Sequence, residues 1–177
     1  MLCMIMTMAD MPEEKRKIEQ LYETYNRLMY VTAYRILQHH EDAEDAVFAS
    51  WEKIIRHLDK ILEIDCQKTA AYIVIIVERT AIDLYRSNKR RGKVQMLMDE
   101  YEDSSFFLTK DIAYEEVEML ELFRSIPKKY GEVLLLYYVN QMTAKEIADV
   151  LSIKQAAVEK RLSRGRKLLR KEIISDG

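Results

Sequence analysis

Apolar residues recur every three to four positions in three successive stretches of the first half of the chain. The first stretch runs from Glu13 to Leu37, the second begins near His40, and the third covers residues 68–91. This spacing matches the 3.6-residue period of an α-helix better than the alternation of a strand. Only four glycines and two prolines interrupt the 177 residues. We therefore predict three helices in this half and an all-α protein.

The most apolar stretch, "YIVIIV" at residues 72–77, is rich in β-branched side chains, which favour strands. Its neighbours on both sides follow the helical period, and the sequence offers no second candidate for a strand. We therefore predict that it belongs to the third helix.

The composition changes after the third helix. Residues 99–121 hold nine acids and a single base, and the helical period is lost from Gly92 to about Asp111. Acidic, aperiodic sequence of this kind is typical of an exposed loop. We interpret it as a linker between two small helical domains.

The domain organisation predicted from these patterns has four parts. A helix is expected to restart near Ala113, and Pro127 marks a break because proline disfavours a helical residue before it. The four parts are an N-terminal tail at 1–12, a helical domain at 13–92, a flexible acidic linker at 93–112 and a second helical domain at 113–177.

The second domain contains the pattern of two helices around a tight turn. Thr143 and Glu146 have the spacing of a capping box, which predicts the start of the first helix. Ser152 and Ile153 occupy the predicted turn. The residues expected to face inward from the two helices are Ile147, Val150, Leu151, Val158, Leu162 and Leu169.

The second helix of this pair is strongly basic, although the whole chain has a formal charge of −2. Residues 154–171 hold eight bases and one acid, a formal charge of +7. A solvated amphipathic helix would explain a basic run alone, but the preceding helix and turn favour a helix-turn-helix, whose second helix enters the major groove of DNA. The side chains expected on or near its outer face are Lys154, Gln155, Ala157, Lys160, Arg161 and Arg164.

The remaining composition argues against several other classes of protein. Cys3 and Cys66 are the only cysteines, and no cluster has the spacing of metal ligands. We find no catalytic constellation or phosphate-binding loop, so we predict neither an enzyme nor a cofactor. No apolar run approaches the length of a membrane span. We expect the protein in a reducing cytoplasm.

The C-terminal sequence "SIPKKYGEVLLLYYVNQMTAKEIADVLSIKQAAVEKRLSRGRKLLRK" resembles region 4 of the extracytoplasmic-function (ECF) sigma factors of bacterial RNA polymerase. This resemblance implies a domain that reads the −35 promoter element through the six outward residues named above. Relatives usually have glycine at the position of Ser152 and serine at the position of Lys154. They often have lysine at the position of Glu159.

The sequence "DAEDAV" and its surroundings, from Tyr25 to Ile61, are similar to region 2 of the same family. The resemblance implies a helix that docks on the polymerase clamp, supported from inside by Ala46, Val47 and Trp51. Phe48 stands where relatives usually have glutamine. The residues implied to bind polymerase are Asp42, Glu44, Asp45 and Phe48.

The sequence "AYIVIIVERTAIDLYRSNKRR" is similar to the helix that the family uses at the −10 element. Strand separation also requires side chains that capture an unstacked base, and the turn at 60–68 is the expected place, although it holds no aromatic residue. The residues implied to contact the −10 DNA are Arg79, Asp83, Arg86, Lys89 and Arg90.

We therefore expect a sigma factor whose partners are core RNA polymerase and promoter DNA, together with the anti-sigma factor that many relatives have. The nearest alternative is a stand-alone dimeric helix-turn-helix regulator, which would need a palindromic site and a self-association surface. A second alternative is a helical adaptor that binds only protein.

Overall fold

The computed structural model describes residues 1–9, 11–92 and 122–175, and every regular element in them is helical. The all-α prediction is confirmed for these residues. The predicted linker and the predicted helix start near Ala113 lie outside the described residues. The elements are α1 (Leu2–Met6), α2 (Pro12–Leu37), α3 (His40–Arg56), the 3-10 turn η1 (Leu58–Lys60), α4 (Gln67–Arg90), α6 (Lys128–Tyr138), α7 (Ala144–Val150) and α8 (Gln155–Ser175).

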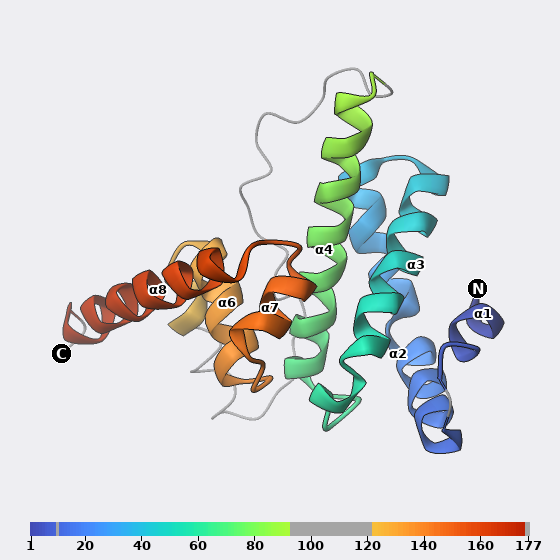
Figure 1. Ribbon diagram of the computed structural model, residues 1–177, viewed down its shortest axis with the longest axis horizontal. Helices are drawn as coiled ribbons and strands as arrows, with labels where there is room; N and C mark the ends of the chain where they lie inside the picture. The colour runs from blue at the N-terminus through green and yellow to red at the C-terminus, as the bar shows by residue number, and fades with distance from the viewer. Residues whose placement is uncertain (10, 93–121, 176–177) are drawn as a thin grey trace. The chain divides into compact units, whose positions relative to one another are not determined.

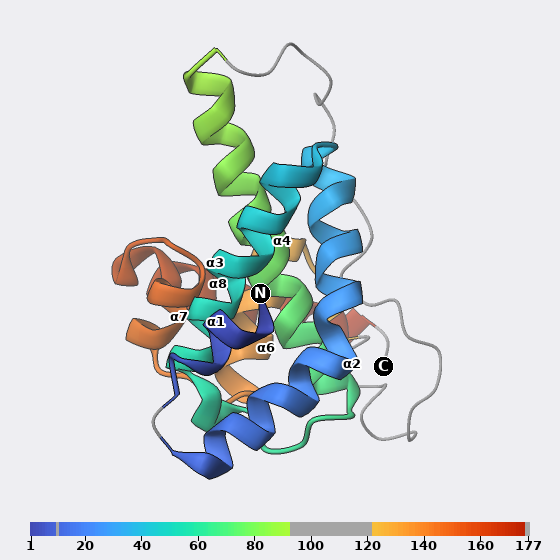
Figure 2. The same ribbon diagram turned by 90° about the vertical axis from the view of Figure 1, so that its right-hand side faces the viewer.

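Contacts group the helices into two compact units, one holding α1 to α3 with α4 from Thr69 onward, and one holding α6 to α8. In the first unit α2, α3 and α4 lie side by side (Figures 1 and 2). Trp51 of α3 is fully buried, and its indole N–H donates to Oδ1 of Asn26 on α2 at 3.2 Å. Its ring also stacks on Tyr22 with 5.7 Å between ring centroids. Trp51 therefore joins α3 to α2 through both apolar and polar contacts.

The first half of α4 is buried almost throughout. Every side chain from Ala70 to Glu78 is buried, so this part of the helix has no solvent face. A helix surrounded by protein is apolar all round, which explains why the sequence at 72–77 resembles that of a buried strand. The prediction of a helix here is confirmed.

The first residues of the chain form a helix that the periodicity did not predict, because it has only five residues. Ile5 of α1 is completely buried, and α1 packs on α2 and α3. The segment predicted as a tail therefore contributes to the core of the first unit.

In the second unit, two glycines allow close packing. A Cβ atom on Gly131 of α6 would lie 2.3 Å from the carbonyl oxygen of Phe123. A Cβ atom on Gly165 of α8 would lie 2.8 Å from Cδ1 of Leu134 on α6. The first neighbour is backbone and the second is the end of a flexible side chain, so the two positions differ in their tolerance of a larger residue.

Candidate nucleic-acid and polymerase interfaces

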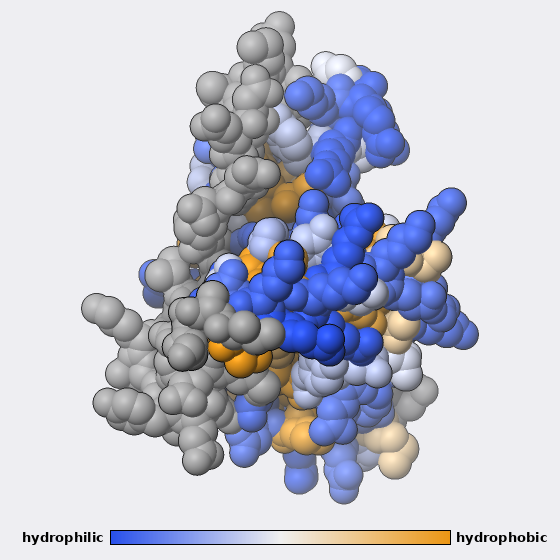
Figure 3. All heavy atoms as spheres, turned by 90° about the vertical axis from the view of Figure 1, so that its left-hand side faces the viewer, coloured by the Kyte–Doolittle hydropathy of each residue, from blue (hydrophilic) through white to orange (hydrophobic). Residues whose placement is uncertain are grey.

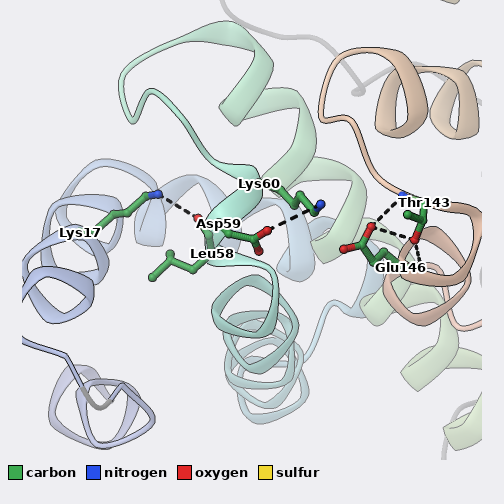
Figure 4. A network of polar contacts seen from close by, with 6 residues as sticks. All are labelled: Lys17, Leu58, Asp59, Lys60, Thr143 and Glu146. Atoms are coloured by element: carbon green, nitrogen blue, oxygen red, sulfur yellow. Dashed lines mark hydrogen bonds and ion pairs between the residues drawn. The ribbon is translucent and has the colours of Figure 1, made fainter.

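The first helix of the predicted helix-turn-helix begins with the expected capping box. The backbone N–H of Thr143 donates to Oε2 of Glu146 at 2.7 Å, and the N–H of Glu146 donates back to Oγ1 of Thr143 at 3.3 Å (Figure 4). These bonds satisfy two donors that a helix start would otherwise leave unpaired. On the inner face, Ile147, Val150 and Leu151 are buried as predicted.

The turn between α7 and α8 is closed by backbone hydrogen bonds. The N–H of Ile153 donates to the carbonyl of Ala148 at 3.0 Å, and the N–H of Ser152 donates to that of Asp149 at 3.2 Å. Ser152 has φ of 52°, in the left-handed region that favours glycine. The serine found here in place of the family's usual glycine therefore adds strain to the turn.

We expect Ser152→Gly to raise the free energy of unfolding by about 0.5–1 kcal/mol, because glycine adopts this conformation without a steric penalty. The matched control is Ser163→Gly on the exposed face of α8, where glycine should lower the free energy of unfolding by a similar amount. Urea denaturation followed by circular dichroism measures both. Destabilisation by Ser152→Gly would contradict the assigned strain.

The second helix, α8, presents most of the predicted DNA contacts to solvent. Its inward side chains Val158 and Leu162 are buried, whereas Leu169 is only half-buried. Long hydrophilic side chains project from the described surface in the view of Figure 3. Among the six predicted contacts, Lys154, Gln155, Lys160 and Arg164 are exposed, and Ala157 and Arg161 are half-buried.

The half-buried position of Arg161 changes how this residue can be tested. Its side chain takes part in the packing of α8 as well as facing the predicted DNA surface, so replacing it would alter folding and binding together. Lys160 and Arg164 are exposed neighbours four residues apart, on one face of the helix. Replacing Lys160 and Arg164 therefore tests DNA contact more cleanly than replacing Arg161.

Gln155, at the start of α8, is held by the only acid in the basic stretch. Its amide Nε2 donates to Oε1 of Glu159 at 3.0 Å. This bond occupies one of the two N–H donors of the Gln155 amide and restricts its orientation, and the carboxylate repels phosphates.

We therefore expect Glu159→Gln to tighten DNA binding by about three- to tenfold, because the variant removes a repulsive charge beside the phosphates. Fluorescence anisotropy with promoter DNA at several salt concentrations measures this, and the gain should shrink as salt rises. Glu172→Gln, near the far end of α8, is the control. Equal gains from both variants would indicate a general charge effect.

One base in α8 has a structural partner that the sequence analysis did not predict. Nε of Arg166 donates to the hydroxyl of Tyr138 at 2.9 Å, and its guanidinium lies 5.3 and 5.7 Å from the ring centroids of Tyr137 and Tyr138. These contacts join α8 to the end of α6. Arg166 therefore contributes to packing as well as to the positive charge of α8.

The basic end of α4 forms a second candidate interface. Arg79, Asp83, Arg86 and Arg90 follow at spacings of four, three and four, which places them on one face of the helix. Arg79 is half-buried, and the other three are exposed, as is Lys89 beside them. At 1.5 Å per residue this face is about 16 Å long. This face is long enough and basic enough to contact several successive phosphates of one DNA strand.

The predicted polymerase-binding residues on α3 divide into two groups. Glu44 and Asp45 are exposed, and Phe48 lies half-buried one turn further along the same side of the helix. Beneath them Ala46 and Val47 are buried, as predicted for residues that support the helix. Two carboxylates beside an aromatic ring form a surface suited to a basic protein partner.

Asp42 differs from the other acids because it takes part in local structure. Its Oδ2 accepts from Nδ2 of Asn88 on α4 at 3.0 Å. Its backbone N–H donates to Nδ1 of His39, the N-cap of α3, at 3.4 Å. Asp42 also lies in the first turn of α3, where a negative charge is favourable. Glu44 and Asp45 lie beyond that turn, so the helix dipole does not account for them.

Two family comparisons cover most of the chain. The family described as Sigma-70 region 2 matches residues 21–91, and the family described as Sigma-70, region 4 matches residues 116–169. The first match contains the α3 and α4 surfaces, and the second contains the helix-turn-helix.

Several curated proteins are similar to this chain, either over most of their own length or over a small part of it. RNA polymerase sigma factor SigV of Bacillus subtilis (strain 168) is 26% identical over 83% of this chain and 85% of the relative. The ECF RNA polymerase sigma factor SigW of the same organism is 27% identical over 86% of the chain and 87% of the relative. The probable RNA polymerase sigma factor RfaY of Xanthomonas campestris pv. campestris is 40% identical over 34% of the chain and 15% of the relative.

The two regions, in this order and with these relatives, define a promoter-directing sigma factor rather than a stand-alone regulator. The chain belongs to the sigma-70 family, in its ECF group. Sigma factors are transcription initiation factors that bind core RNA polymerase and promoter DNA. In the described residues, no helix is long and apolar enough to cross a membrane.

Proposed function

We propose that this protein binds core RNA polymerase through the exposed face of α3 and directs it to promoters with two separate DNA-binding surfaces. Glu44, Asp45 and Phe48 form the polymerase contact, and Asp42 fixes the end of that helix against α4. The observation that carries the proposal is the presence, in one chain, of an acidic face on α3, a basic face on α4 and a basic helix-turn-helix.

In this proposal the exposed face of α4, with Arg79, Asp83, Arg86, Lys89 and Arg90, contacts the −10 element. The N-terminal part of α8 reads the −35 element. The two surfaces belong to domains at 13–92 and 113–177, joined by a linker at 93–112. The protein acts in the cytoplasm, and an anti-sigma factor regulates it.

The experiment is promoter identification with purified core polymerase, followed by variants of α8. The start points of the transcripts made from genomic DNA of the source organism define the promoters. Lys160→Ala combined with Arg164→Ala should then weaken initiation at these promoters about 30-fold, mostly through −35 recognition. The matched control is Lys167→Ala with Arg170→Ala, which removes the same charge two turns further along α8.

Equal losses from the two pairs would mean that α8 contributes general charge and no sequence recognition. Promoters with no shared sequence near −35 would count against the assignment in the same way.

A further inference from the structure

The last turns of α4 contain a buried amide among exposed bases. Asn88 is 6% exposed, whereas Arg86, Lys89 and Arg90 are exposed. Burial of an amide is unfavourable unless the group is hydrogen-bonded. Nδ2 of Asn88 donates to Oδ2 of Asp42, in the first turn of α3, at 3.0 Å. This bond therefore joins the end of α4 that we assign to DNA to the helix that we assign to polymerase.

The start of α3 is held on its other side by the end of α2. A turn of two residues separates these helices. The hydroxyl of Tyr30 is hydrogen-bonded to Nδ1 of His40 at 2.5 Å, and the ring of Tyr34 stacks on the imidazole with 4.7 Å between centroids. The end of α2, the start of α3 and the end of α4 thus lie at the same end of the first unit (Figures 1 and 2). These contacts fix the segment of α3 that carries the acceptor for α4.

A directional bond at this point sets how α4 is rotated about its own axis. Arg86 and Arg90 lie two residues before and two residues after Asn88, which places them about 160° round the helix, on the side away from α3. A rotation equivalent to one residue would turn both guanidinium groups by about 100°. Apolar burial is not directional. The hydrogen bond therefore specifies the direction in which this basic face points.

The polymerase-facing acids lie close to this bond along α3. Glu44 and Asp45 follow Asp42 by two and three residues, which is about 3 and 4.5 Å along the helix axis. Both acids are exposed, while Asp42 bonds α4. Helix ends fray where few contacts hold them. The bond therefore makes the end of α4 part of the same rigid structure as the exposed face of α3.

We propose that Asn88 is a positioning residue for promoter recognition. Its bond to Asp42 fixes the rotation of the basic end of α4 relative to α3, so that the protein bound to core through α3 presents Arg86 and Arg90 to the −10 DNA. A face that is already ordered loses less entropy when it binds. This inference rests on the proposed function and adds a residue that touches neither partner, because Asn88 is buried.

Exchange of the two bonded side chains tests this role. Asn88→Asp places two carboxylates against each other. It should weaken binding of holoenzyme to a DNA fork that carries the −10 element and lacks the −35 element about tenfold. Adding Asp42→Asn restores an amide–carboxylate bond in the reverse direction and should return the affinity to within about threefold of the wild type. Fluorescence anisotropy measures DNA affinity, with core saturated by each variant so that core affinity does not enter.

Ser87→Asp is the matched control, because it adds the same charge to the neighbouring position of α4. Any loss of DNA affinity that it causes should not be relieved by Asp42→Asn. Unchanged DNA binding by Asn88→Asp would overturn the proposal. Equal relief of the Ser87 and Asn88 variants by Asp42→Asn, or no relief of the Asn88 variant, would overturn it as well, since net charge and not the bonded pair would then explain the effect.

The fluorescence of Trp51 in a urea titration shows whether the first unit is folded in each variant. Asn88→Ala adds no charge and should weaken DNA binding about threefold, so it provides the test if Asn88→Asp does not fold. Failure of the wild-type protein to bind core would reject the proposed function itself. Binding of wild-type holoenzyme to the −10 fork with no effect of either Asn88 variant would reject only the positioning role.

Discussion

Gly131→Ala is expected to destabilise the second unit by about 3 kcal/mol and to abolish −35 recognition at physiological temperature. The new methyl group would lie 2.3 Å from the carbonyl oxygen of Phe123, a backbone atom that cannot rotate away. Gly131 and its neighbours up to Leu136 are all buried, so a shift of α6 would disturb the core on which α8 packs.

Gly165→Ala is the matched control, since the closest neighbour of its methyl group would be Cδ1 of Leu134 at 2.8 Å, the end of a flexible side chain and not backbone. The better helix propensity of alanine, worth up to about 1 kcal/mol, offsets that contact. Urea titration followed by circular dichroism measures the stability of both variants. Trp51, the only tryptophan, lies in the first unit, so its fluorescence should be unchanged in each case. Equal stability of the two variants would contradict the close approach at Gly131.

Reversing the charge of both exposed acids on α3, as Glu44→Lys with Asp45→Lys, is expected to weaken binding to core polymerase about 100-fold. Like charges facing each other across an interface cost several kcal/mol. The variant should still fold, because both side chains are exposed and lie beyond the first turn of α3. Competition against a labelled wild-type protein for core measures the loss.

The control is Glu19→Lys with Glu23→Lys, two exposed acids on α2 that give the same change in net charge. We expect this pair to bind core within about threefold of the wild type, because long-range charge effects are screened. Asp42→Asn should lower stability more than core affinity, since Asp42 bonds Asn88. If the α2 pair weakens binding as much as the α3 pair, the contact assigned to α3 is wrong.

Features encoded by local sequence were predictable. The helices of the first half follow from apolar spacing, and the start of α7 follows from Thr143 and Glu146, which lie three residues apart. Both depend on neighbours within one or two turns. The same holds for the inward faces of Ile147 and Val158, both of which are buried.

Contacts between distant residues were not predictable from spacing. Asp42 and Asn88 lie 46 positions apart, and Lys17 reaches carbonyls 41 and 44 positions away. The family resemblance alone therefore grouped Asp42 with the acids predicted to face polymerase. The structure shows that Asp42 also holds α3 against α4. Arg161 shows the same limit, because whether a basic side chain in α8 is half-buried depends on how α8 packs against its neighbours.

The most direct test of the sigma-factor assignment is size-exclusion chromatography of the wild-type protein with sigma-free core RNA polymerase, in the presence and absence of a housekeeping sigma factor. We predict that the protein elutes with core and that the housekeeping factor displaces it, because the proposed contact through α3 makes the two factors compete for one surface of core. Failure of the folded protein to elute with core that still binds the housekeeping factor would contradict the assignment.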